Sequence, residues 1–427
     1  MMPTLMELAA LLVASGLLLQ AGRSLLTGIR HRKMVAREET TALRSFREAT
    51  TELLTQAQTG KIPEAGSWSG FRKFYIHKRA NEADGITSFY LRPYDGKPVP
   101  RYLPGQHLTF RLQIPGNPKP VVRCYSLSDA PIHDNQYRVS IKRLGAPPGS
   151  AGIPDGVGSC FFHDVLEVDR IVDVKAPGGN FYLDMTDRRP VVLIAGGIGL
   201  TPMLSMANTI AYTKNRREVW LFYAVQNRHQ HVMPGHLKRL AREHSNIHVV
   251  ICYAEPTRDC VKGRDFHYRG RINRRLFQGL LPSKDCQFYM CGPPPMQDAL
   301  IEDLRAWGVA EKDIKWESFG KRKGKKPAAP AVGDNVARVE AIEIVFARSG
   351  KVGKWTSEDE TVLDVAEAAG VAMDSGCRAG QCGTCVTAIK QGSVRYLEEP
   401  GTQPLPGTCL ACMAIPKEGL GSRRVTT

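Results

Sequence analysis

Five of the eleven cysteines lie close together near the C-terminal end of the chain. They are Cys377, Cys382, Cys385, Cys409 and Cys412. Cysteine thiolates are soft ligands that hold iron–sulfur clusters or zinc, and the first three follow a C-x4-C-x2-C spacing. A structural zinc site more usually has two C-x2-C pairs or histidines, and no histidine follows His267. The pattern therefore favours an iron–sulfur cluster and a reducing compartment over zinc or a disulfide framework.

This spacing resembles that of plant-type [2Fe–2S] ferredoxins. Glycines between the cysteines allow a tight loop whose N–H groups point at sulfur. The residues alone leave two candidates for the fourth ligand, Cys409 and Cys412. By resemblance to the family's L-x-C, which is followed by a short strand and a proline, Cys412 is the ligand and Cys409 an extra thiol. The metal ligands that the resemblance implies are Cys377, Cys382, Cys385 and Cys412.

The run RCYSLS, residues 123–128, could bind a flat, phosphorylated ligand. Arg123 can pair with a phosphate, Tyr125 can lie against a flat ring, and Ser126 can hydrogen-bond the edge of that ring. Alone, such a hexapeptide is more often ordinary sheet. It is followed by the glycine turn GVGS, residues 156–159, before an apolar stretch, and backbone N–H groups at such a turn suit a pyrophosphate.

A third set of residues follows buried strands farther along the chain. The run VVLIA leads directly into GGIGLTPM, residues 196–203, and small residues there let a phosphate approach the backbone amides. The run QFYMCGPPPM places Cys291 at the end of another strand, where ligands of open α/β sheets bind. An isolated C-G-P would more simply contain a buried structural cysteine. Later, the run WESFG places the aromatic Phe319 after Glu317.

Together these runs resemble R-x-Y-S-x-S, G-G-x-G-x-T-P, C-G-P-x-x-M and E-x-F-G of the ferredoxin-NADP reductase superfamily, of the flavohaemoglobin and oxygenase-reductase type, over residues 71 to about 415. The resemblance implies FAD and NADH or NADPH as cofactors. It implies catalytic roles for Ser126, Cys291 and Phe319, with Phe319 covering the flavin face where nicotinamide lands. The cofactor-binding residues that it implies are Arg123, Cys124, Tyr125, Ser126, Val139, Ser140, Gly158, Ser159, Gly197, Gly199, Thr201, Cys291, Gly292 and Pro293. Arg228 and Arg216 could meet the 2′-phosphate of NADPH or be surface charges; we slightly favour NADH.

Several domains must position these residues. Short alternating runs over about 71–184 predict an antiparallel flavin barrel, and strands alternating with helices predict a parallel-sheet nicotinamide domain. The C-terminal cysteines are expected in an α+β β-grasp ferredoxin domain. The expected segments are a membrane anchor helix at 1–30, a helical spacer at 31–66, the FAD-binding β-barrel at 67–187, the NAD(P)-binding α/β domain at 188–320, a basic linker at 321–336 and the ferredoxin domain at 337–420.

The N-terminal run LAALLVASGLLL, residues 8–19, is marginal in length for a membrane span. Basic residues follow it at once, which favours an anchor that holds the rest on the cytoplasmic face of a bacterial inner membrane. A helix packed on protein is the alternative. The chain carries a net charge of +16, but no aromatic residues alternate with its basic ones, so nucleic acid is a poor candidate partner.

The order of modules resembles the iron–sulfur flavoprotein reductases of bacterial oxygenase systems. We expect electrons to pass from NAD(P)H through FAD and a [2Fe–2S] cluster to a partner oxygenase, hydroxylase or desaturase. In this expectation the ferredoxin domain swings on its linker. The alternatives are a quinone or ferric-chelate reductase, or a redox-sensing subunit of a larger complex.

Overall fold

The structure is a computed structural model that describes residues 68, 70–117, 120–145, 156–319, 342–356, 360–380, 382–396, 400, 404–417 and 424–427. The predicted anchor at 1–30, the spacer at 31–66 and the linker at 321–336 lie outside these residues. Within the described part of the chain, no helix has both the length and the apolar character needed to cross a membrane.

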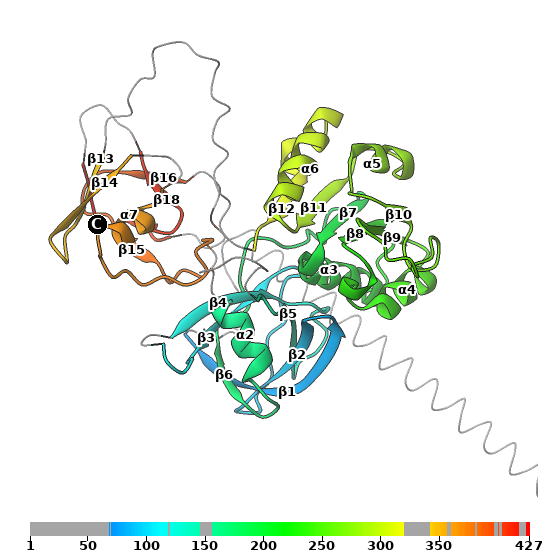
Figure 1. Ribbon diagram of the computed structural model, residues 1–427, viewed down its shortest axis with the longest axis horizontal. Coiled ribbons are helices and arrows are strands. Elements are labelled where there is room, and N and C mark those ends of the chain that lie inside the picture. The colour runs from blue at the N-terminus through cyan, green and yellow to red at the C-terminus, as the bar shows by residue number, and fades with distance from the viewer. Residues whose placement is uncertain are drawn as a thin grey trace, which may run out of the picture. The chain divides into compact units, whose positions relative to one another are not determined.

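The first described domain is an antiparallel barrel (Figure 1). Its elements are β1 (Arg72–Ala83), β2 (Ile86–Pro93), β3 (His107–Leu112), β4 (Val121–Ser126), β5 (Tyr137–Lys142), α2 (Val157–Asp164) and β6 (Ile171–Val174). The strand order is β4-β3-β6-β1-β2-β5, and a bridge between Leu127 and Val139 joins the two ends of this order. Alternating apolar residues fill the interior, where Phe74, Phe89 and Phe110 are fully buried.

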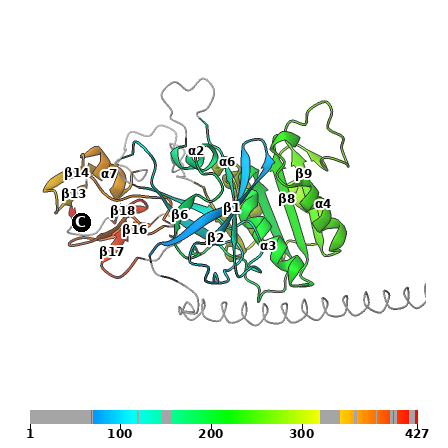
Figure 2. The same cartoon turned by 90° about the horizontal axis from the view of Figure 1, so that it is seen from below.

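The second domain is a parallel sheet with helices on both faces (Figure 2). Its elements are β7 (Val191–Gly196), α3 (Leu200–Tyr212), β8 (Val219–Val225), α4 (Pro234–Glu243), β9 (Ile247–Tyr253), β10 (Tyr268–Arg269), α5 (Arg274–Leu280), β11 (Gln287–Cys291), α6 (Pro294–Trp307) and β12 (Ile314–Glu317). Because side chains alternate along β7, Leu193 packs in one core with α3 and α4, whereas Ile194 packs in another with α5 and α6. The order β10-β9-β8-β7-β11-β12 places the point where strand order reverses between β7 and β11.

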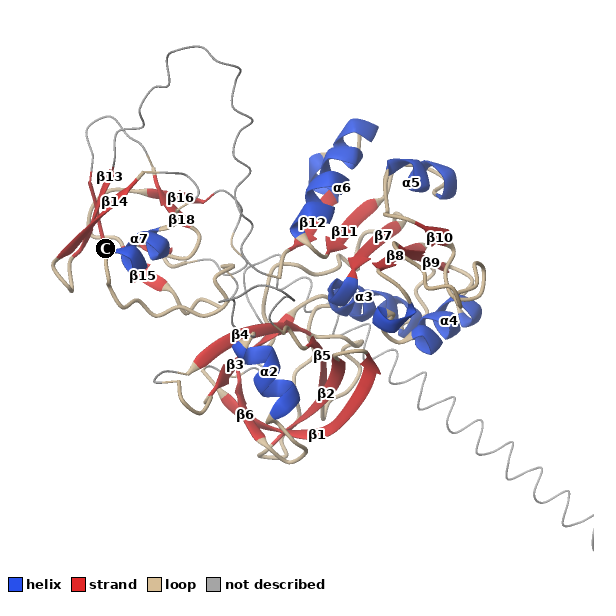
Figure 3. Cartoon of the chain, viewed as in Figure 1, coloured by secondary structure: helices blue, strands red, loops and turns tan. Residues whose placement is uncertain are grey.

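The described residues of the third domain form short strands and the helix α7 (Figure 3). Its elements are β13 (Ile342–Phe346), β14 (Lys351–Trp355), α7 (Val362–Ala368), β15 (Val386–Ala388), β16 (Val394–Tyr396), β17 (Thr408–Leu410), β18 (Ala414–Pro416) and β19 (Arg424–Thr426). A capping box between Thr361 and Asp364 begins α7. The antiparallel sheet, the parallel sheet and the small α+β domain confirm this part of the expected fold class.

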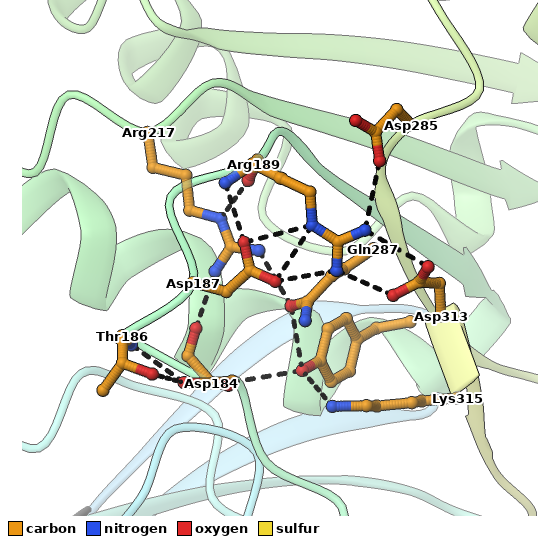
Figure 4. A network of polar contacts seen from close by, with 10 residues as sticks. Asp184, Thr186, Asp187, Arg189, Arg217, Asp285, Gln287, Asp313 and Lys315 are labelled. Atoms are coloured by element: carbon orange, nitrogen blue, oxygen red, sulfur yellow. Dashed lines mark hydrogen bonds and ion pairs between the residues drawn. The ribbon is translucent and has the colours of Figure 1, made fainter. Parts of the chain in front are cut away.

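The connector between the first two domains is fixed by a network of arginines (Figure 4). Arg217 is buried, and its guanidinium donates to the carbonyls of Arg189 at 2.6 Å and Asp184 at 2.7 Å, and to Gln287 Oε1 at 2.9 Å. Arg189 forms ion pairs with Asp187, Asp285 and Asp313. Residues 184–189 are thereby tied to the edge of the parallel sheet where its strands begin.

We expect Arg217→Met to lower the free energy of unfolding by about 3 kcal/mol, because one buried and two half-buried oxygens lose their donor. In a domain of this size that corresponds to an apparent Tm lower by about 6 to 12 °C. Thermal unfolding of the purified full chain measures this change in Tm. Arg216→Met is the matched control, because the neighbouring Arg216 is exposed and its removal should cost less than about 0.5 kcal/mol. Equal Tm values for the two variants would contradict the role of the network.

Candidate functional site

The side chains of Arg123 and Tyr125 meet the first turn of α2. A Cβ on Gly158 would lie 2.8 Å from Arg123 Cγ and 3.3 Å from Tyr125 Oη, so only glycine fits between them. No side chain caps this end of α2, which leaves its first N–H groups to a ligand. Tyr125 packs edge-on against Phe110 and Phe162. An arginine, a ring and uncapped amides in one place fit the predicted binding of a flavin pyrophosphate.

Three other predicted flavin residues already have partners inside the barrel. Val139 is fully buried in the core, which removes its side chain from a ligand. The Ser140 hydroxyl lies 2.8 Å from Ser88 Oγ and 2.9 Å from Ser128 Oγ. Ser159 Oγ donates to the Gly156 carbonyl and accepts from Leu144 N. The side chains of Val139 and Ser140 thus lie in buried surroundings, and the assignment of these two residues to cofactor binding stays a prediction.

Ser126, Cys291 and Glu317 come together from different domains. Ser126 ends β4 in the barrel, while Cys291 and Glu317 are paired neighbours at the ends of β11 and β12. Ser126 Oγ and Glu317 Oε2 are both buried, and within the described residues neither has a partner in good hydrogen-bond geometry. Orphaned buried polar atoms are rare in folded proteins, so these two mark a place for a ligand.

Burial dominates the electrostatics of this group. It raises the pKa of Glu317 to about 8, an effect that the nearby Ser126 hydroxyl opposes only in part. Burial, and secondarily the Glu317 carboxyl, hold the pKa of the Cys291 thiol well above its usual range. Both groups are therefore neutral at pH 7. Glu317 stands in the WESFG run, two residues before Phe319, but the residues of that run alone indicate no role for it.

The α6 residue Gln297 positions Glu317. Gln297 is fully buried, its Nε2 donates to the Glu317 carbonyl at 2.6 Å, and its Oε1 accepts from Ser318 Oγ at 2.6 Å. These bonds hold the backbone that follows β12. Phe319, two residues beyond Glu317, is 50% exposed. An exposed ring at this place is free to meet a planar ligand, as predicted for the gate.

The loop that follows β7 and the loop that follows β11, both predicted to bind the nucleotide, pack tightly against each other at the point where the strand order reverses. A Cβ on Gly199 would clash with the Cys291 carbonyl and lie 2.9 Å from Gly292 N, so the loops approach each other only through glycine. Gly197 has a φ of +55° and open space around it. Pro293 precedes α6, and the Thr201 hydroxyl in the first turn of α3 is bonded to the Ile198 carbonyl at 3.1 Å. Ligands of open α/β sheets bind at this kind of edge.

The two arginines considered for NADPH lie at opposite ends of β8. Arg216 precedes the strand, on the edge away from the nucleotide loops, so it is not placed for the expected ligand. Arg228 follows the strand on the correct edge, but its Nη1 lies 2.6 Å from Asp259 Oδ2. This carboxylate neutralises the arginine and would repel a 2′-phosphate.

The four predicted ligand cysteines form two pairs. Cys385 Sγ lies 3.1 Å from Cys412 Sγ, and backbone N–H groups cross-link Cys377 and Cys382 at 3.3 Å in each direction. Among the described residues, no group of three or more His, Cys, Asp and Glu side chains lies close enough together to hold a single metal ion. Two pairs fit a [2Fe–2S] cluster, which takes two protein ligands on each iron.

The loop that carries these cysteines needs unusual backbone conformations. Arg378, Gly380 and Gly383 have φ values between +53° and +68°. The Ala379 N–H points at Cys377 Sγ at 3.5 Å, a contact that stabilises negative charge on sulfur. The rival candidate Cys409 lies in β17 opposite Thr387 and is fully buried.

Three family descriptions match the chain in the same order as these domains. Residues 78–182 match the oxidoreductase FAD-binding domain, residues 193–301 the oxidoreductase NAD-binding domain, and residues 353–417 the 2Fe-2S iron–sulfur cluster binding domain. These matches agree with the barrel, the parallel sheet and the small cysteine-bearing domain described above.

Curated relatives match a part of this chain. A flavohemoprotein of Halalkalibacterium halodurans is 35% identical over 283 residues, which cover 65% of this chain and 68% of the relative. A flavohemoprotein of Bordetella pertussis is 37% identical over 255 residues, or 60% and 62% of the two chains. The matched part thus spans about two thirds of each relative.

Two solved structures are also similar. The flavohem-like FAD/NAD binding domain of nitric oxide dioxygenase from Vibrio cholerae has 31% identity and a TM-score of 0.52, with 58% of this chain and 99% of that chain covered. An intact type IV self-sufficient cytochrome P450 monooxygenase has 25% identity and a TM-score of 0.56, with 83% of this chain and 40% of that chain covered.

Proposed function

Because the chain belongs to the ferredoxin-NADP reductase superfamily, with a C-terminal 2Fe-2S domain, we propose that it delivers electrons from NAD(P)H to a partner oxygenase, hydroxylase or desaturase. It is an NAD(P)H:acceptor oxidoreductase of the ferredoxin-reductase type, and its cofactors are FAD, NADH or NADPH, and a [2Fe–2S] cluster. The identity of the acceptor is the step beyond this family assignment.

The cofactors supply the change from two-electron to one-electron transfer, since nicotinamide gives a hydride and a [2Fe–2S] cluster carries one electron. The chain's own residues bind and orient them. Arg123 and the first turn of α2 would hold the pyrophosphate, and Tyr125 would contact the flavin. Ser126, Cys291 and Glu317 form a dry, neutral contact at the place where nicotinamide meets flavin. The cysteine pairs 377/382 and 385/412 would each ligate one iron of the cluster.

One observation carries this proposal most directly. The buried Ser126 Oγ and Glu317 Oε2 atoms, which have no partner in good hydrogen-bond geometry in the part of the chain that the structure describes, lie together although their residues belong to different domains. A site that is incomplete without a bound group, and that joins a flavin motif to a nicotinamide motif, fits hydride transfer between two cofactors. The oxygenase partner is supported by the likeness to the self-sufficient monooxygenase, which extends over 83% of this chain.

Anaerobic titration of the purified protein with NADH, and separately with NADPH, tests the proposed function. Flavin bleaching followed by loss of the cluster's visible bands, and reoxidation of both by cytochrome c as a surrogate acceptor, is the expected result. Flavin bleaching with no reduction of the cluster would oppose the proposed electron path. It would instead favour a sensing subunit.

We expect the protein to prefer NADH and Asp259→Asn to weaken that preference. Removing the carboxylate frees Arg228 for a 2′-phosphate, so kcat/KM for NADPH should rise about fivefold while that for NADH stays the same. Steady-state kinetics with both nucleotides measure the ratio of kcat/KM for NADPH to kcat/KM for NADH. Asp95→Asn, which removes a similar ion pair with Arg72 in the barrel, should leave the ratio unchanged. An unchanged ratio in Asp259→Asn would remove Asp259 from nucleotide selection.

We further propose that the N-terminal apolar run anchors the reductase to the cytoplasmic face of a bacterial inner membrane. This proposal rests on residues 1–33 of the sequence, which the structure does not describe. Deleting residues 1–33 should move the protein from the membrane fraction to the supernatant, with its NADH-dependent dye reduction intact. Full-length protein that stays in the supernatant without detergent would defeat the anchor.

A further inference from the structure

The strand β4 has two faces with different surroundings. Arg123 and Tyr125 face the first turn of α2, where the pyrophosphate is proposed to bind. Val122 and Cys124 alternate with them and face the loop that carries Cys377 and Cys382. A single strand thus lies between the proposed flavin and cluster sites.

Three contacts hold the cysteine loop against the barrel at β4 and at the end of β6. A Cβ placed on Gly376 would lie 2.9 Å from Val122 Cβ and 2.8 Å from Cys382 Sγ. Arg123 Nη1 donates to the Gly376 carbonyl at 3.4 Å, and Lys175 Nζ donates to the Cys382 carbonyl at 3.4 Å. Val122 therefore lies next to a predicted ligand sulfur, and the same face of the strand continues to Cys124.

The Cys124 thiol lies within interaction range of the Cys377 and Cys382 thiols, on the strand face that Gly376 of the cysteine loop contacts through Val122. It also lies 3.3 Å from Thr109 Oγ1, opposite it in the β3–β4 pair. Thiolates bound to iron can only accept hydrogen bonds. Cys124 must then be the donor to the ligand sulfurs, and the Thr109 hydroxyl is left to donate to the Cys124 sulfur.

We propose that Cys124, a residue of the flavin-binding strand, donates a hydrogen bond to the cluster ligands Cys377 and Cys382 and thereby raises the reduction potential of the cluster. Reduction adds one negative charge to the cluster, and a donor to a ligand sulfur stabilises that charge. This inference rests on the proposed function and names a positioning residue for it. The assignment of Cys124 to cofactor binding stays a prediction, and the proposed bond adds a role for its side chain toward the cluster.

The test is an EPR-monitored redox titration of purified Cys124→Ala beside the wild type. At a given solution potential the ratio of reduced to oxidised cluster should fall about tenfold, which is about 59 mV for a one-electron couple. Cys124→Ser keeps a hydrogen-bond donor and should bring the ratio of reduced to oxidised cluster most of the way back to the wild-type value. A purely structural role of Cys124 would not give this rescue. Cys286→Ala, a buried thiol at the opposite end of β11, is the matched control and should leave the potential unchanged.

The outcomes separate this inference from the proposed function. Wild-type potential in Cys124→Ala, with NADH still reducing flavin and cluster, would overturn the role of Cys124 and leave the reductase function standing. Absence of cluster reduction by NADH in the wild type would defeat the function itself. Should Cys124→Ala fail to assemble a cluster, Cys124→Val fills the space of the thiol without a donor, and the same shift in potential is expected and decisive.

Discussion

Replacing Cys382 by serine should abolish the visible absorbance of the cluster while NADH still bleaches the flavin. Cys382 is paired with Cys377, and loss of one thiolate leaves an iron with a single protein ligand. The flavin and nicotinamide residues belong to other domains with cores of their own, so their chemistry should continue. Cytochrome c reduction should fall by about 100-fold or more, whereas NADH-dependent ferricyanide reduction should stay near the wild-type rate.

Cys409→Ser is the matched control for this experiment. Cys409 lies three residues from Cys412 but is placed in β17 opposite Thr387, so its variant should keep the cluster. The same comparison tests the choice of fourth ligand, since Cys412→Ser should behave like Cys382→Ser. Loss of the cluster in Cys409→Ser with retention in Cys412→Ser would reverse that choice. Loss of flavin reduction in Cys382→Ser would contradict the separation of the domains.

Changing Glu317 to glutamine should slow NADH-dependent flavin reduction by about 100-fold and remove its pH dependence near pH 8. Below its pKa of about 8 the Glu317 carboxyl carries a proton and can donate it toward Ser126, on the flavin side of the site. The wild-type rate should therefore fall as the pH rises through about 8. Anaerobic stopped-flow between pH 6 and 9.5 measures both profiles. If the rate of flavin reduction in Glu317→Gln still falls as the pH rises through about 8, another group is responsible for this pH dependence.

The same carboxyl should make the stability of the wild type depend on pH. Its pKa is about 8 in the folded chain and 4.5 in the reference state, so the folded chain holds the proton more tightly. Its contribution is fully present below pH 4.5 and is lost as the pH rises toward 8. The glutamine of Glu317→Gln does not titrate, so this variant does not lose stability in this way. Its apparent Tm should therefore decline less than that of the wild type between pH 5 and 8.

Motifs with short spacings were readable from the residues. The C-x4-C-x2-C loop and the glycine runs place their functional atoms within a few bonds of one another, so local backbone geometry is enough to predict what they bind. The alternation of strands and helices likewise indicated an antiparallel sheet followed by a parallel one. The family matches confirm the cofactors that these motifs implied.

Contacts between distant segments could not be read in this way. Strand pairing decides that Val139 and Ser140 face buried surroundings, and that Arg228 but not Arg216 lies on the nucleotide edge. The burial of a strand residue depends on which face of the sheet it occupies, and its access to a nucleotide depends on which end of the strand it follows. The residue type alone indicates neither the face nor the end, because both are set by how the strands pair in the folded sheet.

The sequence by itself determined which groups are present: thiols at cluster spacing, an arginine and tyrosine for a flavin, and glycines for phosphates. Only the tertiary structure decided that Glu317 meets Ser126 across a domain boundary, and that Cys124 faces the cluster ligands. Burial then raised the pKa of Glu317, because desolvation depends on everything packed around a group. Local spacing determines which ligands a short loop can bind, whereas long-range packing sets the charge and the partners of each group.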